Sequence, residues 1–196
     1  MPLTDLDRIR QRSVAAVILA AGAGSRYAGD THKLFAEIDG RPVISHVVDA
    51  ARASEVDEVI VVGGAVDLDS FVPDDVTLIH NEQWADGQAT SLRAAVGYAE
   101  SRRHDALVVG LGDSPGVTTE IWNKVAEVDA DLASARYDGE LRPPVRLSAS
   151  MWASLPVSGD DGARALMRQR PDLVRPVPVE GDPRDIDTLE DLRRWS

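Results

Sequence analysis

The 196-residue sequence has no cysteine, only 5% aromatic residues and a marked shortage of positive charge. The absence of cysteine excludes disulfide bonds, thiolate metal sites and a cysteine nucleophile, and it agrees with a reducing compartment. No apolar run approaches the roughly 18 residues that a membrane-spanning helix needs. The polar N-terminus, MPLTDLDRIRQRS, has no apolar segment of the kind found in secretory signals. We therefore expect a cytoplasmic protein that does not enter a membrane.

The 33 acidic residues outnumber the 21 Lys and Arg residues, which gives a formal net charge of −12. A diffuse negative field repels nucleic acids and anionic membranes, so we expect neither as a partner. A polyanion such as a nucleotide would need a local cluster of positive charge, or a metal ion, to offset this field. Lys or Arg residues that cluster at one place in the sequence are therefore the candidates for a nucleotide site.

Short β-branched runs alternate with helical patterns along the chain, which predicts an α/β fold with a mostly parallel sheet. We see neither repeats nor linkers, so we expect a polar arm over residues 1–12 and a single domain over 13–196. The segment 137–144 breaks the pattern and is either an edge hairpin or an irregular insert. Expected strands cover 14–19, 58–62, 76–79, 106–111, 132–135, 145–147 and 174–179, and expected helices cover 42–53, 87–100, 118–128 and segments that start near 160 and 188.

The loop after the first expected strand combines glycines with two cations in the stretch VILAAGAGSRYAGDTHKLF, residues 17–35. Gly22 and Gly24 follow the strand directly, where glycine lets backbone N–H groups approach phosphate oxygens. A dinucleotide fingerprint would need a third glycine in place of Tyr27, and a P-loop counted from Gly24 meets Asp30 where it needs lysine. From the glycines alone, a tight turn and a phosphate-binding loop are equally good interpretations.

Three further side chains in this stretch favour phosphate binding. Ser25 adds a hydroxyl, Arg26 a guanidinium suited to bidentate phosphate contact, and Lys33 a point charge. Ligands of open α/β sheets bind beyond the carboxyl ends of the strands, and Asp113 follows the strand 106–111 at that same edge. A carboxylate there suits Mg²⁺ held together with substrate phosphates, although it could equally cap a helix.

Several segments, in order, resemble the molybdenum cofactor cytidylyltransferases and related MobA-like NTP transferases. LAAGAGSR…K is similar to the family's LAAGxSxRMGxxK. The other similar segments span nearly the whole chain: IDGRPVISHVVDAA (38–51), NEQWADGQATSLRAAV (81–96), LGDSPGV (111–117), GDDGAR (159–164) and DIDTLEDL (185–192).

The resemblance implies a three-layer, Rossmann-like nucleotidyltransferase fold and an Mg²⁺-dependent enzyme. That enzyme would move CMP from CTP to a phosphorylated acceptor, molybdopterin in this family, and release pyrophosphate. LAAG resembles the CTP-using branch more than the GTP-using one, although another NTP stays open. A molybdenum enzyme that receives the product is a candidate partner.

The resemblance also implies roles for individual residues. Arg26 would hold the β- and γ-phosphates and Lys33 would stabilise charge near the α-phosphate, so these two and Asp113 are the candidate catalytic residues. Mg²⁺ would bind Asp113 and Asp187, with Asp185 as the alternative to Asp187. The candidate nucleotide-binding residues are Ala20, Ala21, Gly22, Gly24, Ser25, Arg26, Lys33, Gly87, Ser91 and Asp113.

The chain departs from the family pattern at places that keep other functions open. Tyr27 replaces a methionine, residues 28–32 lengthen the loop, Ser114 replaces the methionine of GDMP, and LRPPVR (141–146) has proline where the family has histidine. That last stretch would face the acceptor, so a sugar or polyol phosphate is an alternative acceptor. The longer loop motivates a non-catalytic nucleotide-binding maturation factor for a molybdenum hydroxylase. A further alternative is an oxidoreductase that uses the same pocket, but the sequence contains no dinucleotide fingerprint to support it.

Overall fold

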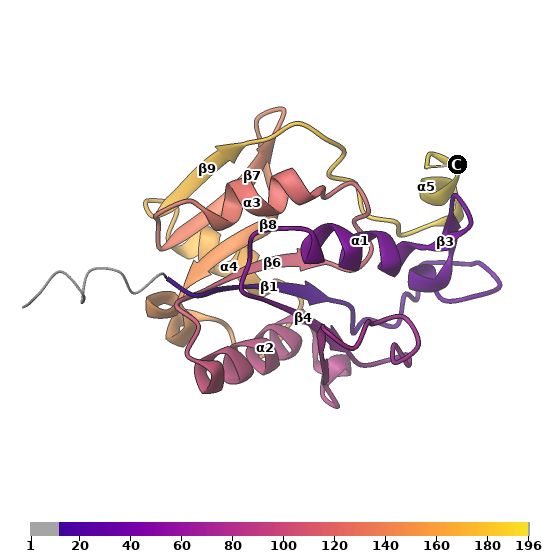
Figure 1. The fold of residues 1–196 in the computed structure, drawn as a ribbon, viewed down its shortest axis with the longest axis horizontal. Helices are drawn as coiled ribbons and strands as arrows, with labels where there is room; N and C mark the ends of the chain where they lie inside the picture. Colours follow the sequence, from indigo (N-terminus) through magenta and orange to yellow (C-terminus); the bar gives the residue numbers. More distant parts are fainter. Residues whose placement is uncertain (1–11, 196) are drawn as a thin grey trace, which may run out of the picture.

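A seven-stranded sheet in the order β5-β4-β1-β6-β8-β7-β9 forms the middle of the computed structural model, which describes residues 12–195 (Figure 1). Strand β8 is antiparallel to both of its neighbours, and every other neighbouring pair is parallel. The predicted α/β class is therefore confirmed. The strands are β1 Val14–Leu19, β4 Glu58–Gly63, β5 Thr77–His80, β6 Ala106–Leu111, β7 Leu132–Tyr137, β8 Glu140–Ser148 and β9 Val174–Pro178.

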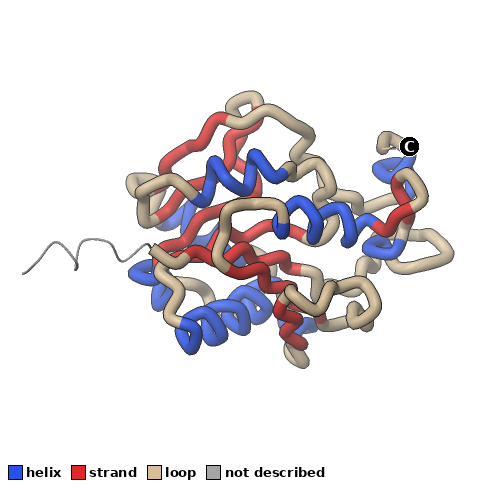
Figure 2. The backbone as a smooth tube through the Cα atoms, in the orientation of Figure 1, coloured by secondary structure: helices blue, strands red, loops and turns tan. Residues whose placement is uncertain are grey.

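Helices cover both faces of this sheet and complete the predicted three layers (Figure 2). One face packs against α1 (Val43–Arg52) and α3 (Thr119–Ala126), and the other against α2 (Gln88–Arg102) and α4 (Gly162–Gln169). Central strands are thus buried on both sides, which explains their continuous apolar runs. No helix within residues 12–195 is long and apolar enough to cross a membrane.

The N-terminal arm that we predicted for residues 1–12 lies outside the described residues, except for Arg12. Its boundary with a single domain over 13–196 stays a prediction. Three short 3-10 helices were not predicted, because their few residues carry no helical period. They are η2 Lys33–Phe35, η3 Trp84–Asp86 and η4 Ala149–Ser154.

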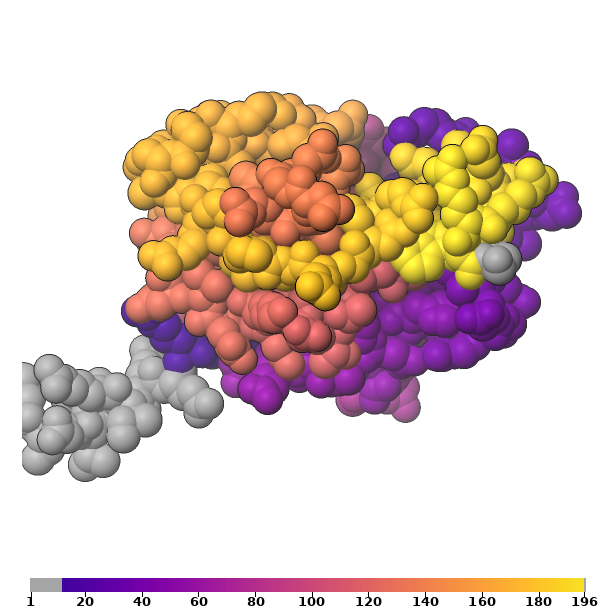
Figure 3. All heavy atoms as spheres, turned by 90° about the horizontal axis from the view of Figure 1, so that it is seen from above, coloured from indigo at the N-terminus to yellow at the C-terminus, as the bar shows by residue number. Residues whose placement is uncertain are grey.

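Helix α1 begins one residue later than predicted, because Pro42 ends a small hairpin of β2 (Glu37–Ile38) and β3 (Arg41–Pro42). The C-terminal helix α5 (Leu189–Arg193) packs beside this hairpin through a third apolar cluster. Figure 3 shows the resulting contact, with the yellow C-terminal segment against the indigo and purple N-terminal part. A capping box of Thr188 and Asp191 starts α5, in agreement with the helix expected to start near residue 188.

The segment 137–144 is a hairpin within the main sheet and not at its edge, because β7 pairs with β9 as well as β8. Asp138 (φ 46°) and Gly139 (φ 94°) form its two-residue turn. A register shift follows Ser134, whose Oγ donates a 3.0 Å hydrogen bond to the Arg142 carbonyl. The start of β8 is thereby held in the conformation that lines the cavity described below.

Two glycines offer a matched test of the packing. A Cβ on Gly110, in β6, would lie 2.6 Å from Cη2 of the buried Trp122, whereas a Cβ on Gly97, in α2, would meet nothing within 4 Å. We expect Gly110→Ala to lower the free energy of unfolding by about 1–3 kcal/mol. Gly97→Ala should raise it by about 0.5–1 kcal/mol, because alanine favours the helix. Urea unfolding measures both, and equal effects would contradict the packing described.

Candidate functional site

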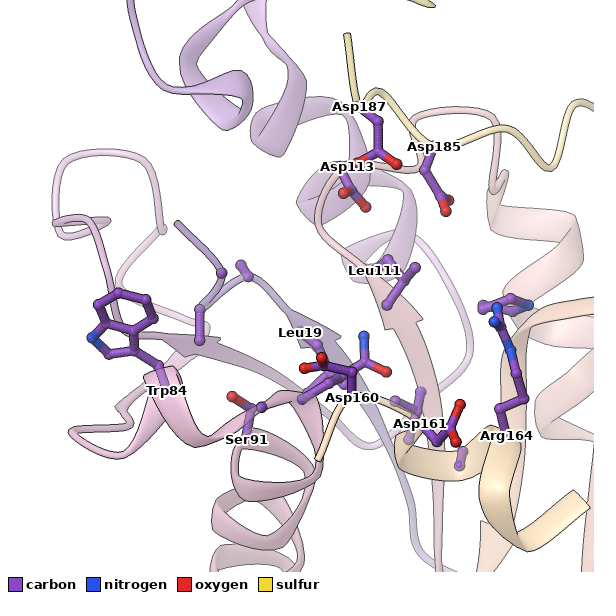
Figure 4. Close-up of a pocket in the computed structure, with 18 of the residues that line it drawn as sticks. Leu19, Trp84, Ser91, Leu111, Asp113, Asp160, Asp161, Arg164, Asp185 and Asp187 are labelled. Atoms are coloured by element: carbon purple, nitrogen blue, oxygen red, sulfur yellow. The ribbon is translucent and has the colours of Figure 1, made fainter. Parts of the chain in front are cut away.

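A cavity of about 970 Å³ lies beyond the carboxyl ends of β1 and β6 (Figure 4). The loop after β1, the start of α2, the first half of β8 and helix α4 form its walls. Ligands of open α/β sheets bind at this edge. All the candidate residues line this one cavity: Ala20, Ala21, Gly22, Gly24, Ser25, Arg26, Lys33, Gly87, Ser91, Asp113, Asp185 and Asp187.

The loop after β1 presents a run of unused backbone donors. It is anchored at its start by hydrogen bonds from the Ala20 N–H to the Val62 carbonyl, 2.9 Å, and from the Ala65 N–H to the Ala21 carbonyl, 3.0 Å. Within residues 12–195, the N–H groups of residues 21–25 have no hydrogen-bond partner. Successive free N–H groups of this kind form a concave site for phosphate oxygens.

His32 holds the two ends of this loop together. Its Nδ1 accepts from the Leu34 N–H at 3.3 Å, so its Nε2 carries the proton and donates to the Gly22 carbonyl at 3.1 Å. Burial lowers the pKa of His32, which favours this neutral form. Gly24 has φ +61°, and a Cβ there would lie 2.9 Å from His32 Nε2. This role was not predicted from the sequence, because the partners of His32 are backbone atoms.

Lys33 lies between two aspartates from distant parts of the chain. Its Nζ is 2.5 Å from Asp113 Oδ2 and 2.8 Å from Asp187 Oδ1, and Arg26 Nη2 is 2.9 Å from Asp187 Oδ2. Burial alone would lower the pKa of Lys33, but the two carboxylates outweigh it and raise the pKa. A hydrogen bond from the Ile186 N–H to the Asp113 carbonyl, 2.9 Å, joins the segments that carry the aspartates.

Asp185 lies beside this group and is paired with Ser114. The Ser114 hydroxyl, in a residue only 2% exposed, donates a 2.6 Å hydrogen bond to Asp185 Oδ1. Burial, and then the charge of Asp113, raises the pKa of Asp185 to about 6. The sequence identified Ser114 as a departure from the family pattern but did not predict its partner, which lies 71 positions away.

The Lys33 ammonium shows that a cation fits between Asp113 and Asp187, since oxygens of both carboxylates reach it. No group of three or more His, Asp or Glu side chains in residues 12–195 is arranged to hold a metal ion by itself. Mg²⁺ commonly binds one or two carboxylates and completes its shell with substrate phosphates and water. The two aspartates therefore suit a divalent ion that arrives with a nucleotide.

Helix η3 and the start of α2 form the opposite wall, where Figure 4 shows Trp84 and Ser91. The buried Asn81 donates from Nδ2 to Ser91 Oγ at 2.9 Å, which leaves the Ser91 hydroxyl hydrogen available to a ligand. Gly87 has φ +104°, and a Cβ there would lie 2.5 Å from the Gly159 carbonyl. Gly87 therefore shapes the wall through close packing, a role that its motif did not reveal.

We expect Asp185→Asn to stabilise the protein at pH 7.5. The raised pKa means that folded Asp185 prefers to be protonated, so its stabilising contribution is complete below pH 3.8 and is lost as the pH rises through about 6. Asparagine still accepts from Ser114 but carries no charge, so the gain should be on the order of 2 kcal/mol at pH 7.5 and near zero at pH 3.5. Urea unfolding at both pH values tests this, with the exposed Asp74→Asn as control.

Removing the Lys33 charge should expose the cation site. We expect Lys33→Met to bind Mn²⁺ without nucleotide at least about tenfold more tightly than wild type, because the competing ammonium is gone. Electron paramagnetic resonance of free Mn²⁺ gives the affinity. Lys124→Met, which breaks an exposed ion pair with Glu120 on α3, is the matched control. Unchanged Mn²⁺ affinity in Lys33→Met would show that the two aspartates do not form a metal site.

The known proteins that resemble this chain share the fold. A model of the MobA-like NTP transferase domain matches residues 16–174. The nicotine blue oxidoreductase of Paenarthrobacter nicotinovorans is 29% identical over 202 residues, covering 92% of this chain and 95% of that protein. Rv0371c from Mycobacterium tuberculosis H37Rv, solved in complex with manganese, has a TM-score of 0.74 at 25% identity, over 93% of this chain and 97% of that one.

Bifunctional GlmU from Alkaliphilus oremlandii is 38% identical over 113 residues, which are 56% of this chain but only 24% of GlmU. The chain thus spans about a quarter of the length of that curated relative. The family model, in contrast, covers most of the chain, including the loop after β1, the start of α2 and Asp113. This chain belongs to the MobA-like NTP transferase family.

Proposed function

We propose that this protein transfers CMP from CTP to a phosphorylated acceptor and releases pyrophosphate, with Mg²⁺ as its cofactor. One observation carries the proposal: five successive free N–H groups, residues 21–25, line the same cavity as Lys33, Asp113 and Asp187. Free donors and cations in an otherwise acidic protein support binding of a triphosphate. Two carboxylates beside them support a metal ion that bridges protein and phosphates.

The triphosphate binds along the loop after β1. The N–H groups of residues 21–25 contact its oxygens, and Arg26, whose side chain is 76% exposed, reaches the β- and γ-phosphates. Lys33 moves from the two aspartates to the α-phosphate when the nucleotide binds. Asp113 and Asp187 would then be free to hold the metal ion.

The transfer is an in-line displacement. A phosphate oxygen of the acceptor forms a bond to the α-phosphorus while the bond from that phosphorus to the bridging oxygen breaks, and pyrophosphate leaves. Lys33 and Arg26 offset the negative charge of the reacting phosphates, and the loop holds them in line. Mg²⁺, bound by Asp113 and Asp187, would supply further charge neutralisation at the phosphates.

The base and ribose lie against the start of α2, near Gly87 and Ser91. The hydroxyl of Ser91, oriented by Asn81, donates to the nucleoside. The choice of CTP over GTP rests on the LAAG sequence of the loop. Molybdopterin is the acceptor that the family resemblance suggests, and a molybdenum enzyme would then receive the product.

Other functions would use the same cavity. The family's histidine corresponds to Pro143 or Pro144, and Pro143 lines the cavity, which favours a different phosphorylated acceptor such as a sugar or polyol phosphate. Binding of CTP without turnover would instead identify a nucleotide-binding maturation factor for a molybdenum hydroxylase. The relative named nicotine blue oxidoreductase covers 92% of this chain, so reduction by NADH belongs in the same set of assays.

We expect CTP with Mg²⁺ to raise the melting temperature more than GTP or NADH does, and pyrophosphate to appear only after an acceptor is added. Asp113→Asn should lower the transfer rate by about a hundredfold or more, because it weakens both the metal site and the position of Lys33. Asp74→Asn, on an exposed loop, is the matched control. Differential scanning fluorimetry and a coupled pyrophosphate assay measure these effects. If no nucleoside triphosphate stabilises the protein, the proposal is wrong.

A further inference from the structure

The cavity has a second half, across from the loop after β1, and its chemistry indicates the class of acceptor. We call it the β8–α4 half, and define it by the lining residues Leu141, Pro143, Val145, Arg164, Met167 and Pro171. In an in-line displacement, the acceptor approaches the α-phosphorus opposite the leaving pyrophosphate. Since the pyrophosphate would lie on the loop after β1, the acceptor enters from the β8–α4 half. This inference rests on the proposed function.

Most cations of the cavity wall are already paired with carboxylates. Lys33 and Arg26 contact Asp113 and Asp187, as described above. Arg142 Nη2 lies 2.9 Å from Glu140 Oε2, and Arg168 makes a bidentate pair with Asp161. These charges are therefore neutralised within the protein.

Arg164, on the first turn of α4, is different. It lines the cavity, yet within residues 12–195 its guanidinium has no ion pair or hydrogen bond, and the nearby Asp161 is already bound by Arg168. In Figure 4 its side chain extends along the wall opposite Trp84 and Ser91, toward the end of the cavity that holds Asp185. A free guanidinium in this position suits a planar, bidentate contact with a phosphate.

Apolar side chains line part of this half, next to the paired Arg142, Asp161 and Arg168 described above. Leu141, Pro143 and Val145 come from β8, and Met167 and Pro171 come from α4 and the loop after it. Leu141 is 40% exposed and is one of two large hydrophobic side chains that the described residues leave exposed. Proline has no N–H group to offer a sugar hydroxyl, whereas these side chains can cover an apolar surface.

We propose that the β8–α4 half binds an acceptor phosphate through Arg164 and that the acceptor carries an apolar body next to this phosphate. The substrate class is thus an alkyl or aryl monophosphate, and not a polyol phosphate. Arg164 and Leu141 determine this specificity, the first through charge and the second through apolar contact.

Binding of two probe phosphates to the full-length protein tests the substrate class. Isothermal titration calorimetry without CTP compares hexyl phosphate with glycerol 3-phosphate, which carry the same headgroup. We expect hexyl phosphate to bind about tenfold more tightly or better, because several methylene groups leave water. Equal affinities, or tighter binding of glycerol 3-phosphate, would overturn the apolar class.

Three variants test whether Arg164 binds the phosphate group of the probe. Arg164→Gln should weaken hexyl phosphate binding about tenfold, and Arg164→Lys, which keeps the charge but not the fork, should lie between that variant and wild type. Arg175→Gln, on β9 and outside the cavity lining, should leave the affinity within about twofold. If Arg164→Gln and Arg164→Lys both bind as wild type does, Arg164 is not the phosphate-binding residue.

These measurements are separable from those of the proposed function. The probes bind in the absence of nucleotide, and CTP binding is followed by its own melting shift. Loss of CTP binding with normal hexyl phosphate binding would contradict only the nucleotidyl transfer. Normal CTP binding in Arg164→Gln, with hexyl phosphate binding lost, is the result that we expect. Loss of both CTP binding and hexyl phosphate binding in Arg164→Gln would show a general folding defect. The hexyl phosphate affinity of Arg164→Lys then decides. An affinity equal to that of wild type would contradict the role of Arg164 as the phosphate-binding residue, and an intermediate affinity would support it.

Discussion

The contact of Lys33 with Asp113 and Asp187 joins three segments that are far apart in the chain. The loop after β1 brings the lysine, the end of β6 brings the first aspartate, and the segment before α5 brings the second. A hydrogen bond from Ile186 to the Asp113 carbonyl, and the apolar cluster around Ile186, hold that last segment in place. The position of α5 beside the β2–β3 hairpin follows from this arrangement, and so does the shape of the cavity.

Charge explains why the two cations lie where they do. The chain carries a net charge of −12, and its cavity contains Asp113, Asp185 and Asp187 at one end. Burial, and then repulsion by the neighbouring charge of Asp113, raises the pKa of Asp185 to about 6. Lys33 and Arg26 neutralise this end and are also the groups suited to phosphate. Lys33 and Arg26 thus stabilise the free protein by pairing with the aspartates, and the same two cations can bind the phosphates of a nucleotide that arrives with its metal ion.

Much of the fold was predictable from local patterns. Strands β1 and β6 have the predicted bounds, because central parallel strands are apolar on both faces and glycine or polar residues end them. The starts of α3 and α5, expected near residues 118 and 188, were also predictable, since Thr118 and Thr188 cap these helices and a cap depends on neighbours in sequence. The position of the hairpin 137–144 inside the sheet was not predictable. It depends on the pairing of β7 with β9, which lie about forty residues apart, and no local sequence pattern indicates that pairing.

By itself, the sequence determined the alternation of strands and helices, the glycine-rich loop with its two cations, and the aspartates that follow the strands. These features depend on residue type and short spacing, which are visible in one dimension. Only the tertiary structure decided which groups meet: Lys33 with two aspartates, Ser114 with Asp185, and His32 with the loop backbone. It also left the Arg164 guanidinium without a partner among residues 12–195. The physical reason is that ion pairs and hydrogen bonds act over a few ångströms in space, whatever the distance along the chain.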